Sequence, residues 1–172
     1  MDETLLVQLA RQGHEEAVDE LFARVWPAVW HWAYAVTADR ALADHVAQET
    51  IYRAFAALDR FDDNRPFLPW LKRITVNRAI DEVRRERRAR RHVATDVPEP
   101  SHDPADERVA STPVVEAVRR LPMPQRLVIV LHYWLDCPVE EIASLLGVRV
   151  GTVASRMSRA RAALKAQLEV CS

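Results

Sequence analysis

The stretch from Val139 to Lys165 limits what this chain can fold into more than any other part of the sequence. Apolar residues recur at helical spacing on both sides of Gly147, namely Ile142, Leu145 and Leu146 before it and Val153, Met157, Ala160 and Leu164 after it. A glycine between two such patterns is typical of a helix C-terminus or a tight turn. The stretch therefore predicts two helices joined by a short turn, which is the arrangement of a helix-turn-helix.

The second of these helices is predicted to have a positively charged exposed face. Between Gly147 and Gln167 the sequence contains five basic residues and no acidic one. Opposite the apolar stripe and on its flanks lie side chains that can reach phosphates and base edges in a major groove: Arg149, Thr152, Ser155, Arg156 and Arg159. The solvated face of an ordinary helical hairpin would show the same periodicity. The missing acidic residues favour DNA binding over that interpretation.

Composition extends the helical prediction to the whole chain. Only three of the 172 residues are glycine, and long runs are rich in Ala, Leu, Arg and Glu, which favours an all-α fold. The formal net charge of −1 hides an uneven distribution. Residues 1–64 carry twelve acidic and five basic side chains, whereas residues 72–91 carry nine basic and three acidic ones. Because nucleic acids bind local basic patches, residues 72–91 form a second candidate surface.

The acidic N-terminal part is predicted to begin with two helices. Leu5, Leu6 and Leu9 lie at helical spacing in a segment that ends at Gly13, and Ala17, Leu21, Val25 and Val29 mark the second helix. Pro27 predicts a kink or a break within that second helix. Four aromatic residues occur close together, and we expect them in the core: Trp26, Trp30, Trp32 and Tyr34.

A third helix is predicted to begin near Asp39. Its buried stripe would consist of Ala47, Ile51, Ala54, Phe55 and Leu58. The other side would carry His45, Gln48, Glu49, Tyr52 and Ala56, with Asp44 and Arg53 on its flanks. Periodicity alone predicts only that this polar side is solvated.

Residues 60–69 form a predicted loop, because Pro66 and Pro69 exclude a continuous helix. A helix with Pro69 as its first residue is expected to follow. It combines an apolar set with a polar row made of Asn77, Asp81, Arg84 or Arg85, and Arg88. Such a row, with Trp70 nearby, can bind phosphates and unstacked bases. Trp70 taken alone favours a core position over base stacking.

Residues 89–112 are typical of a linker, because prolines interrupt a polar, increasingly acidic segment that has no apolar periodicity. We therefore expect a domain over residues 1–90, a flexible linker over residues 91–112 and a second domain over residues 113–172. The expected core of the second domain includes Val114, Val115, Val118, Leu121, Leu127, Val128, Val130, Leu131 and Trp134. Pro138 can open the first helix of the helix-turn-helix, and His132 is expected to pack rather than to bind a ligand.

Three segments in a fixed order give the chain a family resemblance that extends from Leu5 to Leu168. AQETIYRAF resembles the region 2.2 helix of the extracytoplasmic-function (ECF) sigma factors, the smallest class of bacterial RNA polymerase sigma subunits. FLPWLKRITVNRAIDEVRRERR is similar to regions 2.3 and 2.4, and LPMPQRLVIVLHYWLDCPVEEIASLLGVRVGTVASRMSRARAAL is similar to region 4. Each segment alone is only modestly specific for the family. Three such segments in this order, separated by a proline-rich linker, make the resemblance strong.

The resemblance implies a protein that binds core RNA polymerase through the β′ clamp helices and the β flap and directs promoter recognition and DNA opening. It places the polymerase contact at Asp44, Gln48, Glu49 and Arg53. It places the −10 surface at Phe61, Asn64, Trp70, Lys72, Arg73, Asn77, Asp81, Arg84, Arg85 and Arg88, with the loop Phe61–Phe67 beside a flipped base. The −35 contacts would be Arg149, Thr152, Ser155, Arg156 and Arg159. An anti-sigma factor is the further partner that the family implies.

Three positions depart from the family pattern. His45 stands where the family often has Asp, which would alter the polymerase contact. Ala154 replaces a frequent basic residue, which would remove a phosphate contact and weaken the binding of region 4 to DNA. Phe55 replaces a common Trp without an evident consequence.

Two other classes of function stay open on the sequence alone. A stand-alone helix-turn-helix regulator would bind an operator without polymerase, although the second basic surface and the long linker argue against it. A helical interaction protein would have no role in DNA binding. An enzyme is the least favoured class, because the six histidines are scattered and the sequence has no Gly-rich phosphate loop and no nucleophile–base constellation. Neither a cofactor nor a metal site is expected.

The cysteines and the apolar runs indicate where the protein works. Cys137 and Cys171 belong to no CxxC or Cys/His cluster, so we expect free thiols in a reducing cytoplasm. The sequence has no charged-then-apolar leader and no apolar run near 18 residues. We therefore expect neither secretion nor a membrane span.

Overall fold

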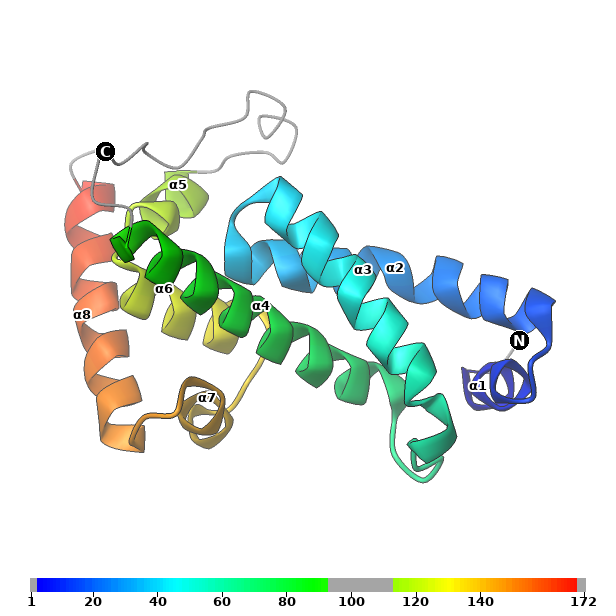
Figure 1. Cartoon of the computed structure of the whole chain (residues 1–172). Coiled ribbons are helices and arrows are strands. Elements are labelled where there is room, and N and C mark those ends of the chain that lie inside the picture. Colours follow the sequence, from blue (N-terminus) through cyan, green and yellow to red (C-terminus); the bar gives the residue numbers. More distant parts are fainter. Residues whose placement is uncertain (1–2, 93–112, 170–172) are drawn as a thin grey trace. The chain divides into compact units, whose positions relative to one another are not determined.

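The computed structural model describes residues 3–92 and 113–169, which are helical and contain no strand (Figure 1). The chain divides into two compact units, with the boundary between Ala94 and Thr95. The predicted all-α fold of two helical domains is confirmed. The last helix of the first unit continues to His92, and residues 93–112, which make up most of the predicted linker, lie outside the described residues.

Over its described residues, 3–92, the first unit contains four α-helices and a short 3₁₀ turn. These are α1 (Glu3–Arg11), α2 (Glu15–Thr37), α3 (Arg40–Ala56), the turn η1 (Leu58–Arg60) and α4 (Phe67–His92). The three long helices α2, α3 and α4 pack on one another, and α1 packs on α2 and on η1. The predicted positions Ala17, Leu21, Val25 and Val29 are all buried, as are Ala47, Ile51, Ala54 and Leu58. Phe55 is only half-buried.

The boundaries of α2 and α3 follow from local chemistry. Asp39 is the N-cap of α3, and its Oδ1 accepts a hydrogen bond of 2.8 Å from the backbone N–H of Leu42. Of the kink or break predicted at Pro27, the break does not occur, because α2 continues from Glu15 to Thr37. Proline leaves the carbonyl four residues earlier, that of Ala23, without its helical partner. Both Ala23 and Pro27 are exposed, so water can solvate that carbonyl.

Helix α4 begins two residues earlier than Pro69, the predicted first residue. Phe67 is its first residue and is buried, with its ring centroid 5.3 Å from that of Phe61 and 5.5 Å from that of Trp70. Packing of Phe67 in the core thus extends the helix backwards. Pro69 is tolerated in this first turn because the N–H groups there have no helical acceptor.

The aromatic residues of α2 lie at the edge of the core rather than inside it. Trp26, Trp30, Trp32 and Tyr34 are each half-buried, which corrects the prediction of a core cluster. Phe22 extends the row at a spacing of four residues, and its ring stacks on that of Trp26 with 5.4 Å between centroids. Trp30 and Tyr34 stack in the same way at 5.1 Å. The row covers the side of the core with large rings whose outer edges contact solvent.

The second unit is built around its last helix. It contains α5 (Pro113–Arg119), α6 (Met123–Ile129), the π-helical turn η3 (Val130–Trp134), α7 (Val139–Leu146) and α8 (Val150–Glu169). Helix α8 packs on α5, α6 and α7. Most of the predicted core is buried, namely Val118, Leu121, Leu127, Val128, Val130 and Leu131. Val115 is half-buried, and Val114 is exposed.

Trp134 is the clearest error in the predicted core, because 48% of its surface is exposed. The π-helical turn explains why. The N–H of Leu135 donates to the carbonyl of Val130, five residues earlier, at 3.1 Å. The prediction assumed 3.6 residues per turn, as in an α-helix. A π-helical turn contains more residues, so the side chains at its end point in other directions than the α-helical pattern predicts. Leu135 and Cys137 are buried instead.

The turn between α7 and α8 confirms the role predicted for Gly147. This glycine has φ of 63°, in the left-handed region that favours glycine. Its N–H donates to the carbonyl of Ser144 at 3.2 Å, and the N–H of Val148 donates to that of Ala143 at 3.0 Å. This pair of bonds is a Schellman motif, which ends α7 and directs the chain into α8.

Candidate polymerase and DNA interfaces

The four residues predicted to contact polymerase all lie on α3. Asp44 is oriented by Trp30, whose indole Nε1–H donates to Oδ1 of the carboxylate at 2.6 Å. The Arg40 guanidinium lies 6.0 Å from the centre of the Trp30 ring and adds a cation–π contact. Gln48 is exposed one turn further along the helix. The half-exposed ring of Trp30 therefore fixes one end of this surface.

Glu49 and Arg53 form an ion pair on the same helix. Nε of Arg53 lies 2.7 Å from Oε1 of Glu49, four residues earlier, a favourable spacing on a helix surface. The hydrogen bond from Arg53 lowers the pKa of the Glu49 carboxyl, and the positive charges of Arg53 and Arg78 lower it further. Glu49 is thus held as a carboxylate, and Arg78 links it electrostatically to α4.

Tyr52 extends this surface, although no role was predicted for it. It follows Asp44 and Gln48 in the same row at a spacing of four residues, and 75% of its surface is exposed. An aromatic side chain this exposed on a helix of a packed unit is a candidate interface residue. Its position on the polar side of the predicted helix was visible, but periodicity does not distinguish a solvated tyrosine from a binding one.

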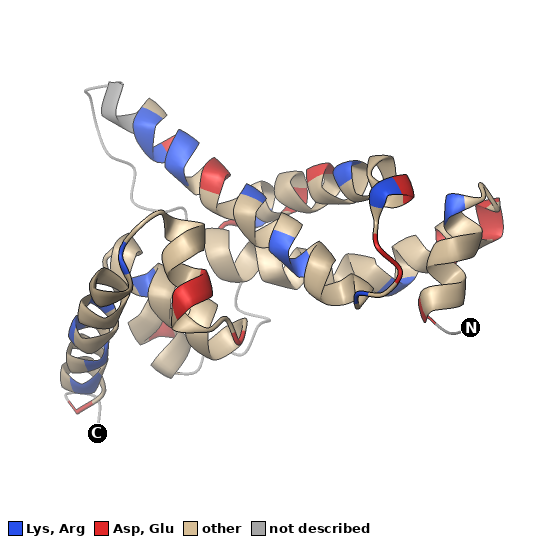
Figure 2. Cartoon of the chain, turned by 90° about the horizontal axis from the view of Figure 1, so that it is seen from below, with Lys and Arg blue, Asp and Glu red and all other residues tan. Residues whose placement is uncertain are grey.

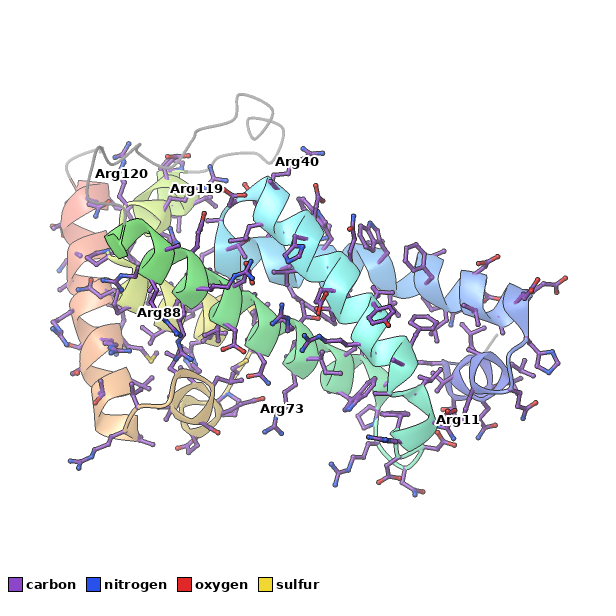
Figure 3. The ribbon with its side chains drawn as sticks, viewed as in Figure 1. Arg11, Arg40, Arg73, Arg88, Arg119 and Arg120 are labelled. Atoms are coloured by element: carbon purple, nitrogen blue, oxygen red, sulfur yellow. The ribbon has the colours of Figure 1, made fainter. Side chains whose placement is uncertain are left out.

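The predicted −10 residues of α4 form an exposed row on the side opposite the core. Asn77, Asp81, Arg85 and Arg88 are exposed, and Arg84 is half-exposed. Arg73 begins the row one turn before Asn77, and Figure 3 shows the labelled side chains of Arg73 and Arg88 projecting from α4. Lys72 is half-buried. The row combines cationic groups for phosphates with amide and carboxylate groups for base edges.

A buried carboxylate lies beneath this row. Glu82 is only 4% exposed, and its Oε1 lies 2.6 Å from Nη2 of Arg85. Its other oxygen lies 3.9 Å from Nη2 of Arg78. On the surface, Asp81 and Arg84 form a longer pair at 3.9 Å. Two guanidinium groups thus compensate a charge that would be costly to bury alone, and Glu82 orients Arg85 at the edge of the row.

The loop over residues 61–66 separates exposed polar groups from buried aromatic ones. Phe61 is 8% exposed, and its ring centroid lies 4.9 Å from that of Trp70, which is half-buried. Both rings pack beneath the loop, as the core position favoured for Trp70 predicts, and their contact with the −10 element stays a prediction. Asn64 is exposed at the tip, where its backbone N–H and side-chain amide donate to Oδ1 of Asp62 at 3.0 and 2.9 Å.

The predicted −35 residues occupy the first three turns of α8 and the residue before it. Arg149, Ser155 and Arg159 are exposed, and Thr152 and Arg156 are partly exposed. The opposite side of the helix packs in the core through Val153, Met157 and Ala160. The Ser155 hydroxyl donates to the carbonyl of Thr152 at 3.0 Å, which leaves its oxygen able to accept. Ala154 is exposed between these residues, so a basic side chain there would have reached solvent.

Basic residues lie along the two helices that carry the predicted DNA surfaces, α4 and α8. Figure 2 shows Lys and Arg positions, coloured blue on the ribbon, along α4 and along α8. In residues 3–92 and 113–169, no three His, Cys, Asp or Glu side chains are grouped as metal ligands. No helix in this described part of the chain is both long and apolar enough to cross a bilayer.

Comparison with known proteins identifies both units. Residues 21–89 match the family described as Sigma-70 region 2, and residues 111–164 match the family described as Sigma-70, region 4. The chain is 33% identical to the RNA polymerase sigma factor CnrH of Cupriavidus metallidurans over 183 residues, covering 98% of this chain and 95% of CnrH. It is 35% identical to the ECF RNA polymerase sigma factor SigL of Mycobacterium tuberculosis over 147 residues, with 82% of each chain covered.

Solved structures give the same result. The structure of CnrH in complex with the cytosolic domain of CnrY matches with a TM-score of 0.60 at 33% identity and covers 99% of each chain. The sigma factor RpoE of Bartonella quintana, solved with the anti-sigma factor NepR, matches with a TM-score of 0.61 at 23% identity, covering 88% of this chain and 96% of RpoE. The second likeness supports the fold alone.

The chain belongs to the ECF family of RNA polymerase sigma factors. It binds core RNA polymerase and directs promoter recognition and DNA opening in transcription initiation, as the sequence resemblance implied. The stand-alone regulator and the helical interaction protein, which the sequence alone had left open, are not supported. The helix-turn-helix of the second unit is the region 4 element of this family.

The ion pair on α3 can be tested by titration. Replacing Arg53 with Ala should raise the pKa of Glu49 towards its ordinary value of 4.5, because the carboxylate loses its hydrogen-bond donor and its nearest cation. ¹³C NMR titration of the Glu49 side-chain carboxyl measures this. Arg24→Ala, which removes the ion pair with Glu20 on α2, should leave the titration of Glu49 unchanged. An identical Glu49 titration in the native protein and in Arg53→Ala would contradict the ion pair.

Proposed function

We propose that this ECF sigma factor recognises promoters through three surfaces that act together only on core RNA polymerase. The exposed side of α3, with Asp44, Gln48, Glu49 and Arg53, binds the β′ clamp helices. The polar row of α4 and the tip of the 61–66 loop open and read the −10 element. The exposed side of α8, with Arg149, Thr152, Ser155, Arg156 and Arg159, reads the −35 element.

The observation that carries the proposal is the two-sided character of α4. One side is buried through Leu71, Val76 and Ile80, and the other exposes a row from Asn77 to Arg88. Because α4 packs directly on α3, a polymerase subunit that binds α3 also fixes the orientation of the row on α4. The polymerase contact and the −10 surface are therefore parts of one rigid helical unit.

Binding at the −10 element must offset the energy needed to separate the strands. Extruding a base costs a few kcal/mol in unpairing and unstacking. Arg85 and Arg88 can bind the phosphates of the separated strand, and the Asn77 amide offers both a donor and an acceptor to a base edge. The exposed Asn64 at the tip of the loop offers the same groups beside the flipped base.

Binding at the −35 element needs no strand separation. An α-helix fits the major groove of duplex DNA, and the side chains of its N-terminal turns reach the base edges. Arg149 and Arg159 supply charge for phosphates, which makes binding sensitive to salt. Thr152 and Ser155 can contact base edges. The exposed Ala154 provides no charge, so we expect region 4 to hold DNA weakly when it is not supported by polymerase.

The weakness of each DNA contact is part of the mechanism. Once polymerase holds the sigma factor, binding of one promoter element raises the effective concentration of the other surface at its own element. Selectivity then comes from both elements together. Neither contact involves bond chemistry, and we assign the protein no catalytic role.

Two further assignments rest on the family. We expect the protein to act in the cytoplasm, where the polymerase and promoter DNA are found. We also expect an anti-sigma factor to hold it inactive, since the family resemblance implies one. The solved CnrH structure contains a bound partner, the cytosolic domain of CnrY.

The polymerase surface is tested by the double variant Gln48→Ala and Glu49→Ala. These changes remove an exposed amide and a paired carboxylate from the middle of the α3 surface. We expect recovery of core polymerase in a pull-down to fall about tenfold, because loss of a well-made polar contact or two costs about 1–3 kcal/mol. The control, Gln12→Ala with Asp19→Ala, likewise removes one amide and one carboxylate, from exposed positions elsewhere on the unit. Normal recovery with the α3 variant would refute this surface.

The −10 surface is tested by replacing Arg84 and Arg85 with Ala. We expect permanganate reactivity of the −10 strand to fall about tenfold or more while the pull-down of core polymerase stays near normal, because these residues belong to the proposed −10 surface and not to the proposed polymerase surface on α3. The control Arg161→Ala with Lys165→Ala removes two positive charges from exposed positions of α8 outside the predicted −35 set. Equal losses of polymerase binding and of opening would count against this assignment.

A further inference from the structure

Helix α1 has no role in the function proposed so far. It precedes residues 21–89, which match the region 2 family, and it carries no residue of the polymerase or DNA surfaces. It is nevertheless part of the core, because Leu6, Val7 and Ala10 are buried. Its last residue, Arg11, contacts the segment that leads into the 61–66 loop (Figure 3).

All three guanidinium nitrogens of Arg11 are used in this contact. Nη1 and Nη2 bind the two carboxylate oxygens of Asp63 at 3.1 and 2.7 Å, which is the bidentate geometry that arginine and a carboxylate form most strongly. Nε donates to the carbonyl of Leu58 at 3.1 Å, and Nη2 also donates to the carbonyl of Phe61 at 3.0 Å. Gln8, one turn earlier on α1, adds a longer bond of 3.4 Å to Asp63.

These bonds hold the loop at points next to its exposed tip. Asp63 directly precedes Asn64, the exposed residue that we assign to the flipped base. Asp62, on the other side of Asp63, accepts hydrogen bonds from the backbone N–H and the side-chain amide of Asn64. Beneath the loop, Phe61 packs on Phe67 and Trp70. The loop is thus held on its inner side by aromatic packing and on the α1 side by Arg11.

The Arg11 and Asp63 side chains are 26% and 31% exposed, so the pair is neither deep in the core nor fully solvated. A pair at this depth is shielded from much of the screening that weakens surface ion pairs. Lysine could keep the charge of Arg11, but its single ammonium group could not bind both carboxylate oxygens and two carbonyls in this fixed arrangement. The contact therefore depends on the shape of the guanidinium as well as its charge.

We propose that Arg11, assisted by Gln8, is a positioning residue for −10 recognition, which sets the loop so that Asn64 can receive an unstacked base. Helix α1 is then a part of the promoter reader that touches neither DNA nor polymerase. The inference rests on the proposed function of the loop. It predicts an effect on the choice of one base, which a contribution to stability alone would not produce.

The test is a selection of −10 sequences by the complete holoenzyme. Core polymerase is combined with the full-length native chain, Arg11→Lys or Asp63→Asn, and each holoenzyme selects from single-stranded DNA randomised over the −10 element. Base preference is then measured at every position. Arg24→Lys is the control. It alters another arginine–carboxylate pair, in which Arg24 lies 2.8 Å from Glu20 within α2. Melting temperature and recovery of core polymerase are measured for each variant.

We expect Arg11→Lys and Asp63→Asn to lose about tenfold in preference at the same single position, with other positions, polymerase recovery and the control unchanged. A preference identical to that of the native chain would overturn the proposal. So would a uniform loss at all positions that follows the melting temperature or the polymerase recovery, because that pattern indicates a structural role only. If the native holoenzyme selected no sequence, the proposed function itself would fail, and the positioning role with it.

Discussion

Burial of one side of α4 is the constraint on which the first unit depends. Leu71, Val76 and Ile80 are almost fully buried against α2 and α3, and each contributes about 1.5–3 kcal/mol of hydrophobic stabilisation. Because a helix repeats every 3.6 residues, fixing these side chains also fixes the opposite row from Asn77 to Arg88. The core therefore determines which groups can meet DNA. Glu82 joins the two sides, since it is buried yet pairs with the exposed Arg85.

The same principle organises the other surfaces at smaller scale. Val153, Met157 and Ala160 anchor α8, so that Arg149, Ser155 and Arg159 face outwards. On α3, Trp30 orients Asp44 from the edge of the core. In the 61–66 loop no helix imposes a periodic face, and directed contacts replace it: aromatic packing of Phe61 inside and the guanidinium of Arg11 from α1. Elements outside the proposed DNA surfaces thereby hold the groups of those surfaces in place.

Much of this architecture follows from the sequence because helical periodicity and capping are local. The stripe of α2, the start of α3 near Asp39, the turn at Gly147 and the polar row of α4 were all predictable in this way. The errors lie where tertiary contacts or unusual turns override the local pattern. Packing of Phe67 moved the start of α4, and the π-helical turn exposed Trp134. The Arg11–Asp63 pair was not predictable, because periodicity does not relate positions 52 residues apart.

We propose that these surfaces select promoters only as parts of the polymerase holoenzyme. The most direct measurement is transcription in vitro on a genomic template library, with start sites read from the RNA, alongside footprinting of the same DNA by the free protein. We expect a discrete set of start sites that share a −10 and a −35 element and appear only when the protein is added to core polymerase, with no matching footprint from the free protein. Unchanged start sites, or selective protection of those promoters by the free protein, would contradict it.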